Sequence, residues 1–193
     1  PTGDHAGLQR DMQTFIRDTS GPIPVQRLGN VEEATLYGLD LDLHYLPPAV
    51  DGLSLSLGLG LLETELGAFP SSGGIQPAGA EAPNAPGVSF NVGAAYEFPL
   101  SDDWSGRLQT NGRYTGETWK DAQNLPILRA DAFWVWDARL SAGSADGWDL
   151  ALWVKNLADE RYVTHAVSLL SLGFGQRVYG PPRTYGLSAS RAF

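Results

Sequence analysis

Hydrophobic and polar residues alternate with a period of two along most of this chain. The clearest stretch covers residues 53–61, where leucine at every second position alternates with serine or glycine. A period of two places successive side chains on opposite faces of a β-strand, and no segment shows a convincing helical period. The pattern therefore predicts an all-β fold of about eight antiparallel strands in meander order. The predicted strands cover residues 9–16, 34–45, 53–61, 88–98, 104–119, 134–142, 148–155 and 185–193.

The last predicted strand shows what the two faces are made of. Tyr185, Leu187, Ala189 and Phe193 share one face, while glycine, serine and alanine occupy the other. Strands with one apolar face and one small or polar face are typical of a wall between lipid and a water-filled lumen. A closed barrel pairs its last strand with its first and so leaves no exposed edge. We therefore predict the strands of a transmembrane β-barrel.

The connections between the predicted strands alternate between tight and long. Tight turns are predicted at residues 47–52, 99–103 and 143–147, and long connections at 18–33, 67–86, 120–130 and 164–183. The stretch 67–86 is rich in Pro, Gly and Ala, which predicts a mobile loop. Transmembrane barrels have short periplasmic turns and longer external loops, so the tight turns are assigned to the periplasmic side. Aromatic residues favour the headgroup level, and those at the predicted periplasmic strand ends are Tyr45, Phe98, Trp104, Trp148 and Phe193.

Composition narrows the classes of function. The 193 residues carry a net charge of -9 and no cysteine, which argues against a nucleic-acid partner and excludes disulfides and thiolate metal sites. The sequence contains no run of about 18 apolar residues, so no membrane-spanning helix is predicted. Catalytic motifs, phosphate loops and dinucleotide fingerprints are absent, so neither enzyme activity nor a cofactor is predicted. The first residues show no signal-peptide pattern, and we expect the chain to be a piece of a longer protein.

Three segments resemble motifs of one family of outer-membrane transporters. They are residues 30–40 (NVEEATLYGLD), residues 154–162 (VKNLADERY) and residues 180–187 (GPPRTYGL), which leads into the final strand. In the second segment, Asn156 and Asp159 are turn formers that we expect to interrupt the strand at the barrel rim. On these residues, taken together and in this order, the chain is similar to the TonB-dependent receptor family.

The resemblance implies a function and a set of partners. Residues 1–193 would be the C-terminal part of the receptor β-barrel, without the plug domain, in the outer membrane of a Gram-negative bacterium. The implied activity is import of a scarce ligand, such as a siderophore-iron complex, cobalamin or an oligosaccharide. The implied partners are outer-membrane lipid, the remainder of the barrel with its plug, the TonB energy-coupling protein through the missing N-terminal part, and the outer-membrane assembly machinery. In this reading Tyr185, Leu187 and Phe193 close the barrel and carry the assembly signal.

The candidate site residues are charged or titratable side chains on the predicted lumen face. Two aspartates and a histidine in residues 40–44 have the spacing of a metal site, but a single histidine with no second ligand set disfavours one. The arginines are candidates for contact with an anionic ligand or with plug carboxylates. The alternative is a solvated wall in which they pair with Glu97, Glu117 or Asp137. The candidate residues are Asp40, Asp42, His44, Arg107, Arg113, Arg139 and Lys155.

Two other classes of protein stay open from the sequence. A complete small eight-stranded outer-membrane barrel, acting as an adhesin, an enzyme or a structural protein, requires the strand at 9–16 to pair with the last strand. A soluble β-barrel binding protein requires the leucine face of residues 53–61 to be buried. Solubility without detergent would support the soluble protein and exclude both membrane interpretations.

Overall fold

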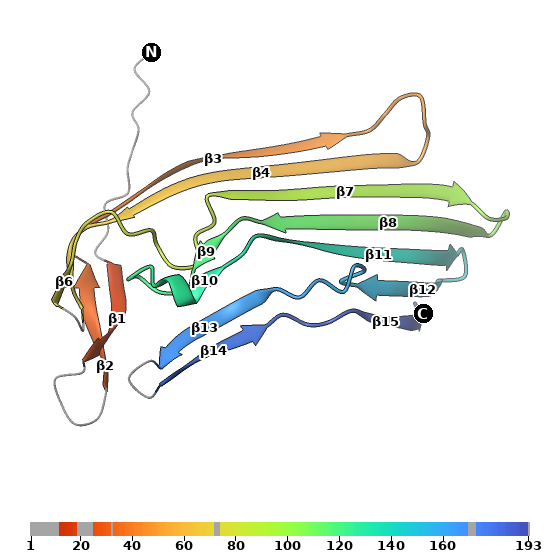
Figure 1. Ribbon diagram of the computed structural model, residues 1–193. Coiled ribbons are helices and arrows are strands. Elements are labelled where there is room, and N and C mark those ends of the chain that lie inside the picture. Colours follow the sequence, from red (N-terminus) through yellow and green to blue (C-terminus); the bar gives the residue numbers. More distant parts are fainter. Residues whose placement is uncertain (1–11, 19–24, 32, 72–73, 170–172, 193) are drawn as a thin grey trace, which may run out of the picture.

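The computed structural model describes residues 12–18, 25–31, 33–71, 74–169 and 173–192. Seven strands form the main sheet, in the order β15-β12-β11-β8-β7-β4-β3, and each neighbouring pair is antiparallel (Figure 1). This is the predicted meander. The seven strands are β3 (Ala34–Tyr45), β4 (Leu53–Leu66), β7 (Val88–Pro99), β8 (Trp104–Thr115), β11 (Phe133–Ser144), β12 (Trp148–Lys155) and β15 (Thr184–Arg191).

The register of the main sheet places the apolar positions of all seven strands on one face. Leu57 of β4 lies opposite Leu43 of β3 and Val92 of β7. Across the other half of the sheet, one row runs from Leu108 through Leu140 and Leu152 to Leu187. Large side chains of this face are well exposed, among them Tyr37, Leu39, Leu41, Leu43, Tyr45, Leu55, Leu57, Leu61, Tyr96, Leu108, Leu140, Leu150, Leu152, Tyr185 and Leu187. A contiguous apolar surface of this kind needs an apolar surrounding or a partner, as the wall of a membrane barrel does.

The central strand β8 carries two glycines and a threonine among its positions on this apolar face. Its Gly106 and Gly112 lie under the rings of Phe98 and Trp136 from the neighbouring strands, because a Cβ atom at either glycine would come within 2.6 Å of a ring carbon. Between them, the Thr110 hydroxyl donates to the carbonyl oxygen of Asp137 over 3.1 Å. The apolar face is therefore continuous even where its central strand carries glycine and threonine.

Tight turns and long connections lie at opposite ends of the sheet. The three tight turns follow β3, β7 and β11 at the right of Figure 1, at the end where β15 also finishes, and the long connections are at the left. This arrangement agrees with the predicted sorting of the connections.

The segment before β3 and each long connection between later strands of the main sheet contain short paired strands. They are β1 (Met12–Asp18) with β2 (Val25–Val31), β5 (Phe69–Ser71) with β6 (Gly74–Gln76), β9 (Thr118–Trp119) with β10 (Arg129–Ala130), and β13 (Val163–Leu169) with β14 (Phe174–Tyr179). A 3-10 turn, η1 (Pro126–Leu128), precedes β10. The interpretation of residues 67–86 as a loop without strands is wrong for the part that forms β5 and β6. There, backbone pairing outweighs a composition that is unfavourable for strands.

The first predicted strand has a different place from the one a small closed barrel requires. Its described part forms β1, which pairs with β2 and not with β15. Seven of the eight predicted strands make up the main sheet, and in the described residues β3 and β15 are its edges. Residues 9–11 and Phe193 lie outside the described part of the chain.

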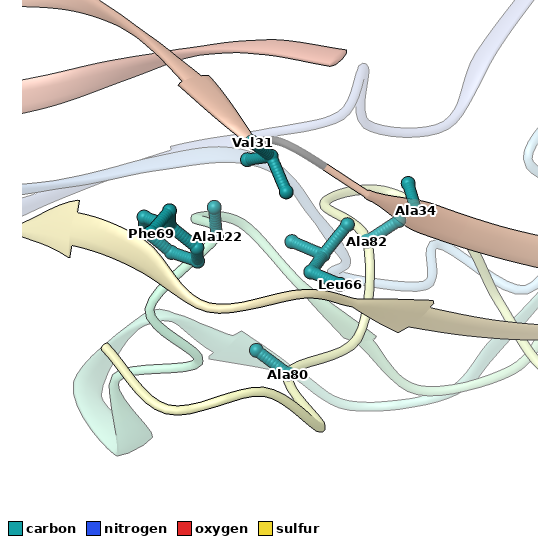
Figure 2. Packing of buried hydrophobic residues seen from close by; sticks show 7 residues of the cluster. All are labelled: Val31, Ala34, Leu66, Phe69, Ala80, Ala82 and Ala122. Atoms are coloured by element: carbon teal, nitrogen blue, oxygen red, sulfur yellow. The ribbon is translucent and has the colours of Figure 1, made fainter. Parts of the chain in front are cut away.

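A small hydrophobic core lies where the long connections meet the main sheet. Leu66 at the end of β4 and Val31 at the end of β2 are fully buried, and Phe69 of β5 packs beside them (Figure 2). Alanines from the wall and from two connections complete the cluster: Ala34, Ala80, Ala82 and Ala122. The connections are thereby packed against the end of the wall that the sequence predicts to be external, here called the external end. No helix in the described residues has the length and apolarity that crossing a membrane requires.

Candidate functional site

The face opposite the apolar one carries the candidate residues. One row across five strands contains His44, Ser56, Gly93, Asn111 and Asp137. The strand positions of all seven candidates share this polar face, as the alternation predicted. Four of the seven, His44, Arg107, Arg139 and Lys155, line one concavity of about 740 Å³. Asp40 lines a separate concavity of about 390 Å³, and Asp42 and Arg113 line neither of the two.

Ion pairs occupy two of the three candidate arginines. Arg139 contacts Asp149 at 3.0 Å and Arg107 contacts Glu97 at 3.4 Å. These side chains are between 39% and 60% exposed, so each pair contributes at most about 1 kcal/mol. Of the predicted acidic partners, only Glu97 has this role.

In the part of the chain that the structure describes, Glu117 and Asp137, the other two acidic residues named in the alternative of a solvated wall, form no ion pair with these arginines. Glu117 forms its ion pair with Arg129 in an external connection, and an Asp137 carboxylate oxygen accepts the backbone N–H of Asn156 over 2.8 Å. Asp137 lines the same concavity as Arg107 and Arg139, but its hydrogen-bond partner is the Asn156 backbone.

The remaining candidates are less constrained. The ammonium group of Lys155 lies 5.9 Å from the centre of the Trp153 ring. Across the described residues, neither Arg113 nor Lys155 has an ion-pair partner within 4.0 Å. In the same part of the chain, no three side chains of His, Cys, Asp or Glu come together as a metal site would require.

The segment after Lys155 is a hydrogen-bonded node at the external rim. Asn156 is only 3% exposed and adopts a left-handed backbone conformation with φ of 52°. Its side-chain amide donates to the carbonyl oxygens of Glu160 (2.9 Å) and Pro181 (3.0 Å), and its side-chain oxygen accepts the N–H of Glu160 over 2.8 Å. Since Pro181 lies three residues before the start of β15, this one side chain connects the segment that follows β12 to the segment that leads into β15.

A second turn former completes the node. Asp159 has φ of 56°, and its carboxylate accepts the backbone N–H of Arg183 over 2.7 Å. The Arg183 guanidinium donates to the carbonyl oxygen of Leu157 over 3.3 Å. The prediction that Asn156 and Asp159 form turns is confirmed. Beyond the node the chain continues into β13, returns through β14, and enters β15, so the node marks the boundary between wall and external ribbon.

Side chains also connect the external connections to one another. Asn124 accepts the N–H of Glu81 over 2.7 Å and donates to its carbonyl oxygen over 3.0 Å, although 43 residues separate them. The ammonium group of Lys120 donates to the side-chain oxygen of Asn84 over 3.1 Å. The hydroxyl of Thr64 accepts the N–H of Ala82 over 2.9 Å. The sequence gives no signal for these pairs beyond the turn-forming character of the two asparagines, both of which have positive φ.

Burial shifts two titrating groups in this layer. Loss of solvent raises the pKa of the Asp121 carboxyl above its ordinary value, although backbone N–H groups, including that of Leu125, act in the opposite direction. Loss of solvent also lowers the pKa of the neighbouring Lys120 ammonium. Both groups lie in the connection between β9 and η1, outside the strands of the wall.

The predicted barrel-closing residues lie at the edge of the described sheet. Tyr185 and Leu187 of β15 are 77% and 81% exposed on the apolar face. Their strand pairs with β12 along its whole length, from Thr184 opposite Lys155 to Arg191 opposite Trp148. The guanidinium of Arg191 lies 5.4 Å from the centre of the Trp148 ring at the end with the tight turns.

Comparison with known families identifies the protein family to which this chain belongs. Residues 8–157 match the sequence model of the TonB-dependent receptor-like β-barrel. The chain belongs to this family. TonB-dependent receptors are transporters and receptors rather than enzymes, and they are outer-membrane proteins of Gram-negative bacteria.

Solved receptors of low sequence identity have the same fold. The ferric yersiniabactin uptake receptor FyuA of Yersinia pestis is 16% identical with a TM-score of 0.70, over 84% of this chain and 24% of the receptor. The ferric-catecholate import receptor Fiu of E. coli K12 is 22% identical with a TM-score of 0.63, over 96% and 24%. The copper transporter OprC is 20% identical with a TM-score of 0.68, over 96% and 27%. The chain thus spans about a quarter of the length of these TonB-dependent receptors.

Proposed function

We propose that the chain is the C-terminal part of the barrel of a TonB-dependent receptor that imports a scarce ligand across the outer membrane. The observation that carries this proposal is the continuous two-faced wall, in which seven strands in register separate an exposed apolar face from a polar one. The apolar face fits outer-membrane lipid, and the polar face fits a lumen that holds the plug. The remaining barrel strands, the plug and the TonB contact would belong to the rest of the receptor.

The external connections support ligand capture as the role of this part. They form paired strands joined by side-chain hydrogen bonds at one end of the wall, where a ligand arriving from outside would first meet the receptor. Two of the similar receptors are described as ferric-siderophore uptake or import receptors and a third as a copper transporter. The ligand class we propose is a metal chelate such as a siderophore-iron complex, with cobalamin or an oligosaccharide as alternatives.

An uptake assay on the complete receptor tests this function. The receptor would be expressed in cells lacking their own iron receptors, with and without TonB, and supplied with labelled ferric siderophores, copper, cobalamin and oligosaccharides. We expect one of these to accumulate only in cells that have both the receptor and TonB. Accumulation that does not depend on TonB would contradict the proposal, and so would a failure of all of the compounds to accumulate. Cells carrying an empty vector are the control.

The assignment to part of a larger barrel has a separate test. In the described sheet β3 and β15 lack a neighbour on one side, and open strand edges promote association between chains. We therefore expect the isolated 193-residue chain to aggregate or exchange strands in detergent. A monomeric species that changes mobility on heating would instead show a complete small barrel. The coding sequence upstream of Pro1 gives an independent answer, because we expect it to continue into further strands and a plug.

A further inference from the structure

Arg177 of β14 reaches from its own external ribbon to a different connection. Its guanidinium donates to the carbonyl oxygens of Ile127 (3.0 Å) and Arg129 (3.5 Å), 50 and 48 residues away. Beside these bonds, the end of the Ile127 side chain packs against the backbone of β14, because a Cβ atom at Gly175 would lie 3.5 Å from its Cδ1. Two backbone acceptors and an apolar contact therefore meet at one place.

The acceptor side of this contact is itself held in position. The Arg129 guanidinium forms an ion pair with Glu117 and lies 5.8 Å from the centre of the Trp119 ring. The Trp119 carbonyl oxygen accepts the N–H of Asn84 over 2.8 Å, which extends the chain of contacts to the connection that contains β5 and β6. Arg177 thus connects β14 to a segment that is already joined to another external connection.

The base of the ribbon is fixed independently. Asn156 connects Glu160 and Pro181, so the segments that lead into β13 and out of β14 are held together at the rim. With a fixed base, β14 can leave the neighbouring connection only if the contacts at Arg177 and Ile127 open. Both bonds come from one guanidinium nitrogen, Nη2, whose N–H groups have fixed directions in the plane of the group, whereas a lysine ammonium at the same position is a point donor on a flexible chain.

We propose that Arg177 latches β13 and β14 onto residues 126–130, so that these external connections respond to a ligand as one body. Arg177 is a positioning residue in this scheme, since it acts through the backbone of its neighbours. The expected effect of the latch on ligand capture by the external connections rests on the proposed function. The latch itself is a property of the receptor without ligand, so it can be tested separately.

Hydrogen–deuterium exchange on the complete, unliganded receptor in lipid nanodiscs tests the latch. In the Arg177→Ala variant we expect exchange to rise about tenfold both in residues 126–130 and in residues 174–179, because opening on one side frees the other. Arg161→Ala is the matched control. The Arg161 guanidinium lies 4.1 Å from the centre of the Tyr179 ring, within the same ribbon, so its loss is expected to affect residues 174–179 alone.

The conservative variant Arg177→Lys distinguishes loss of the latch from a general folding defect. Arg177→Lys is expected to give an intermediate rise in residues 126–130, with a normal fraction of heat-modifiable receptor. Unchanged exchange of residues 126–130 in Arg177→Ala, or an equal rise there in Arg161→Ala, would overturn the latch. If the uptake assay fails while the exchange pattern holds, the proposed ligand function falls and the latch remains.

Discussion

Leu57 and Leu66 belong to the same strand, yet Leu57 is 36% exposed and Leu66 is completely buried. Leu57 lies on the apolar face of the wall, between Leu43 and Val92, and Leu66 lies nine residues later in the small core beneath the external connections. In the proposed receptor lipid is the apolar partner of the wall, so the wall's side chains would need no protein neighbour beyond the sheet. In the external layer the surrounding solvent is water, so the chain must supply its own core.

Hydrogen bonding differs between the same two regions. In the wall, backbone ladders satisfy the polar groups, as a membrane requires. In the external layer, short ladders are supplemented by side chains that bind distant backbone groups, as Asn124 does with Glu81 and Arg177 does with Ile127. Substitutions should therefore act by different rules on the two sides of the rim.

A charge on the apolar face is the largest expected perturbation. We expect Leu57→Arg to destabilise the folded receptor by about 3 kcal/mol, because arginine is costly near the bilayer midplane. The control is Ser56→Arg, one residue away on the polar face, with an expected cost below about 1 kcal/mol. Urea unfolding of the complete receptor in lipid vesicles measures both. Equal costs for the two variants would show that the apolar face does not meet lipid.

The converse substitution examines the external core. We expect Leu66→Ala to destabilise the external layer by about 2.5 kcal/mol, because it removes a fully buried side chain from a cluster that can only partly collapse. Hydrogen exchange of residues 79–86 and 118–130 is the measurement, and it should rise while exchange within β8 and β11 stays unchanged. Leu57→Ala, whose side chain keeps lipid contact, is expected to leave the external layer as it is.

Removal of the Asn156 side chain tests how much its hydrogen bonds stabilise the junction between the wall and the external layer. Asn156→Ala leaves the N–H of Glu160 and the carbonyl oxygens of Glu160 and Pro181 without their partners, with an expected cost of about 2 kcal/mol. Exchange of residues 156–162 and 180–183 should rise most. Asn156→Asp retains the acceptor for Glu160 and should cost less. Equal effects of the two variants would show that the side-chain acceptor contributes little and that the amide donors account for the stabilisation.

The smallest expected effect is a pH dependence confined to the external layer. The raised pKa of Asp121 means that its protonated form is favoured in the folded connection. The corresponding stability is present below the unfolded pKa and is lost as pH rises through the raised folded pKa. Between about pH 4 and about pH 7, we expect the free energy of opening at Leu125, corrected for intrinsic exchange, to fall by less than about 1 kcal/mol. Asp121→Asn, which keeps an acceptor for the Leu125 N–H, should remove this dependence.

The sequence predicted the wall better than the external layer, for a physical reason. A strand between lipid and water repeats every two residues, so residues 53–61 of β4 are recognisable from their own pattern, whereas the continuation of β4 to Leu66 was not predicted. The contacts of Asn124 and Arg177 join residues more than 40 positions apart and have no local period. Hairpin β5–β6 was not predicted for a related reason. Its Gly- and Pro-rich residues have no local strand pattern, and the strands are stabilised by pairing with each other and by the core around Phe69.

The candidate site shows the same division. Alternation placed all seven candidates on one face, because a face is a local property of a strand. Of the acidic partners offered for the arginines, Glu97 pairs with one of them, Arg107, which is directly opposite in the adjacent strand. Asp137 was assigned to the arginines because it shares their face, but its position beside the rim makes it the acceptor for Asn156. Proximity to a turn that departs from the ladder cannot be derived from period-two alternation.

The glycines of β8 make some substitutions in the wall conditional on others. A side chain at Gly112 collides with the Trp136 ring, and a smaller side chain at residue 136 uncovers the Gly112 backbone toward lipid. Each change alone is expected to be harmful, while Gly112→Val combined with Trp136→Val should restore a filled apolar surface. The two positions are therefore an epistatic pair, and any gradual replacement of this part of the wall has to pass through a less stable intermediate.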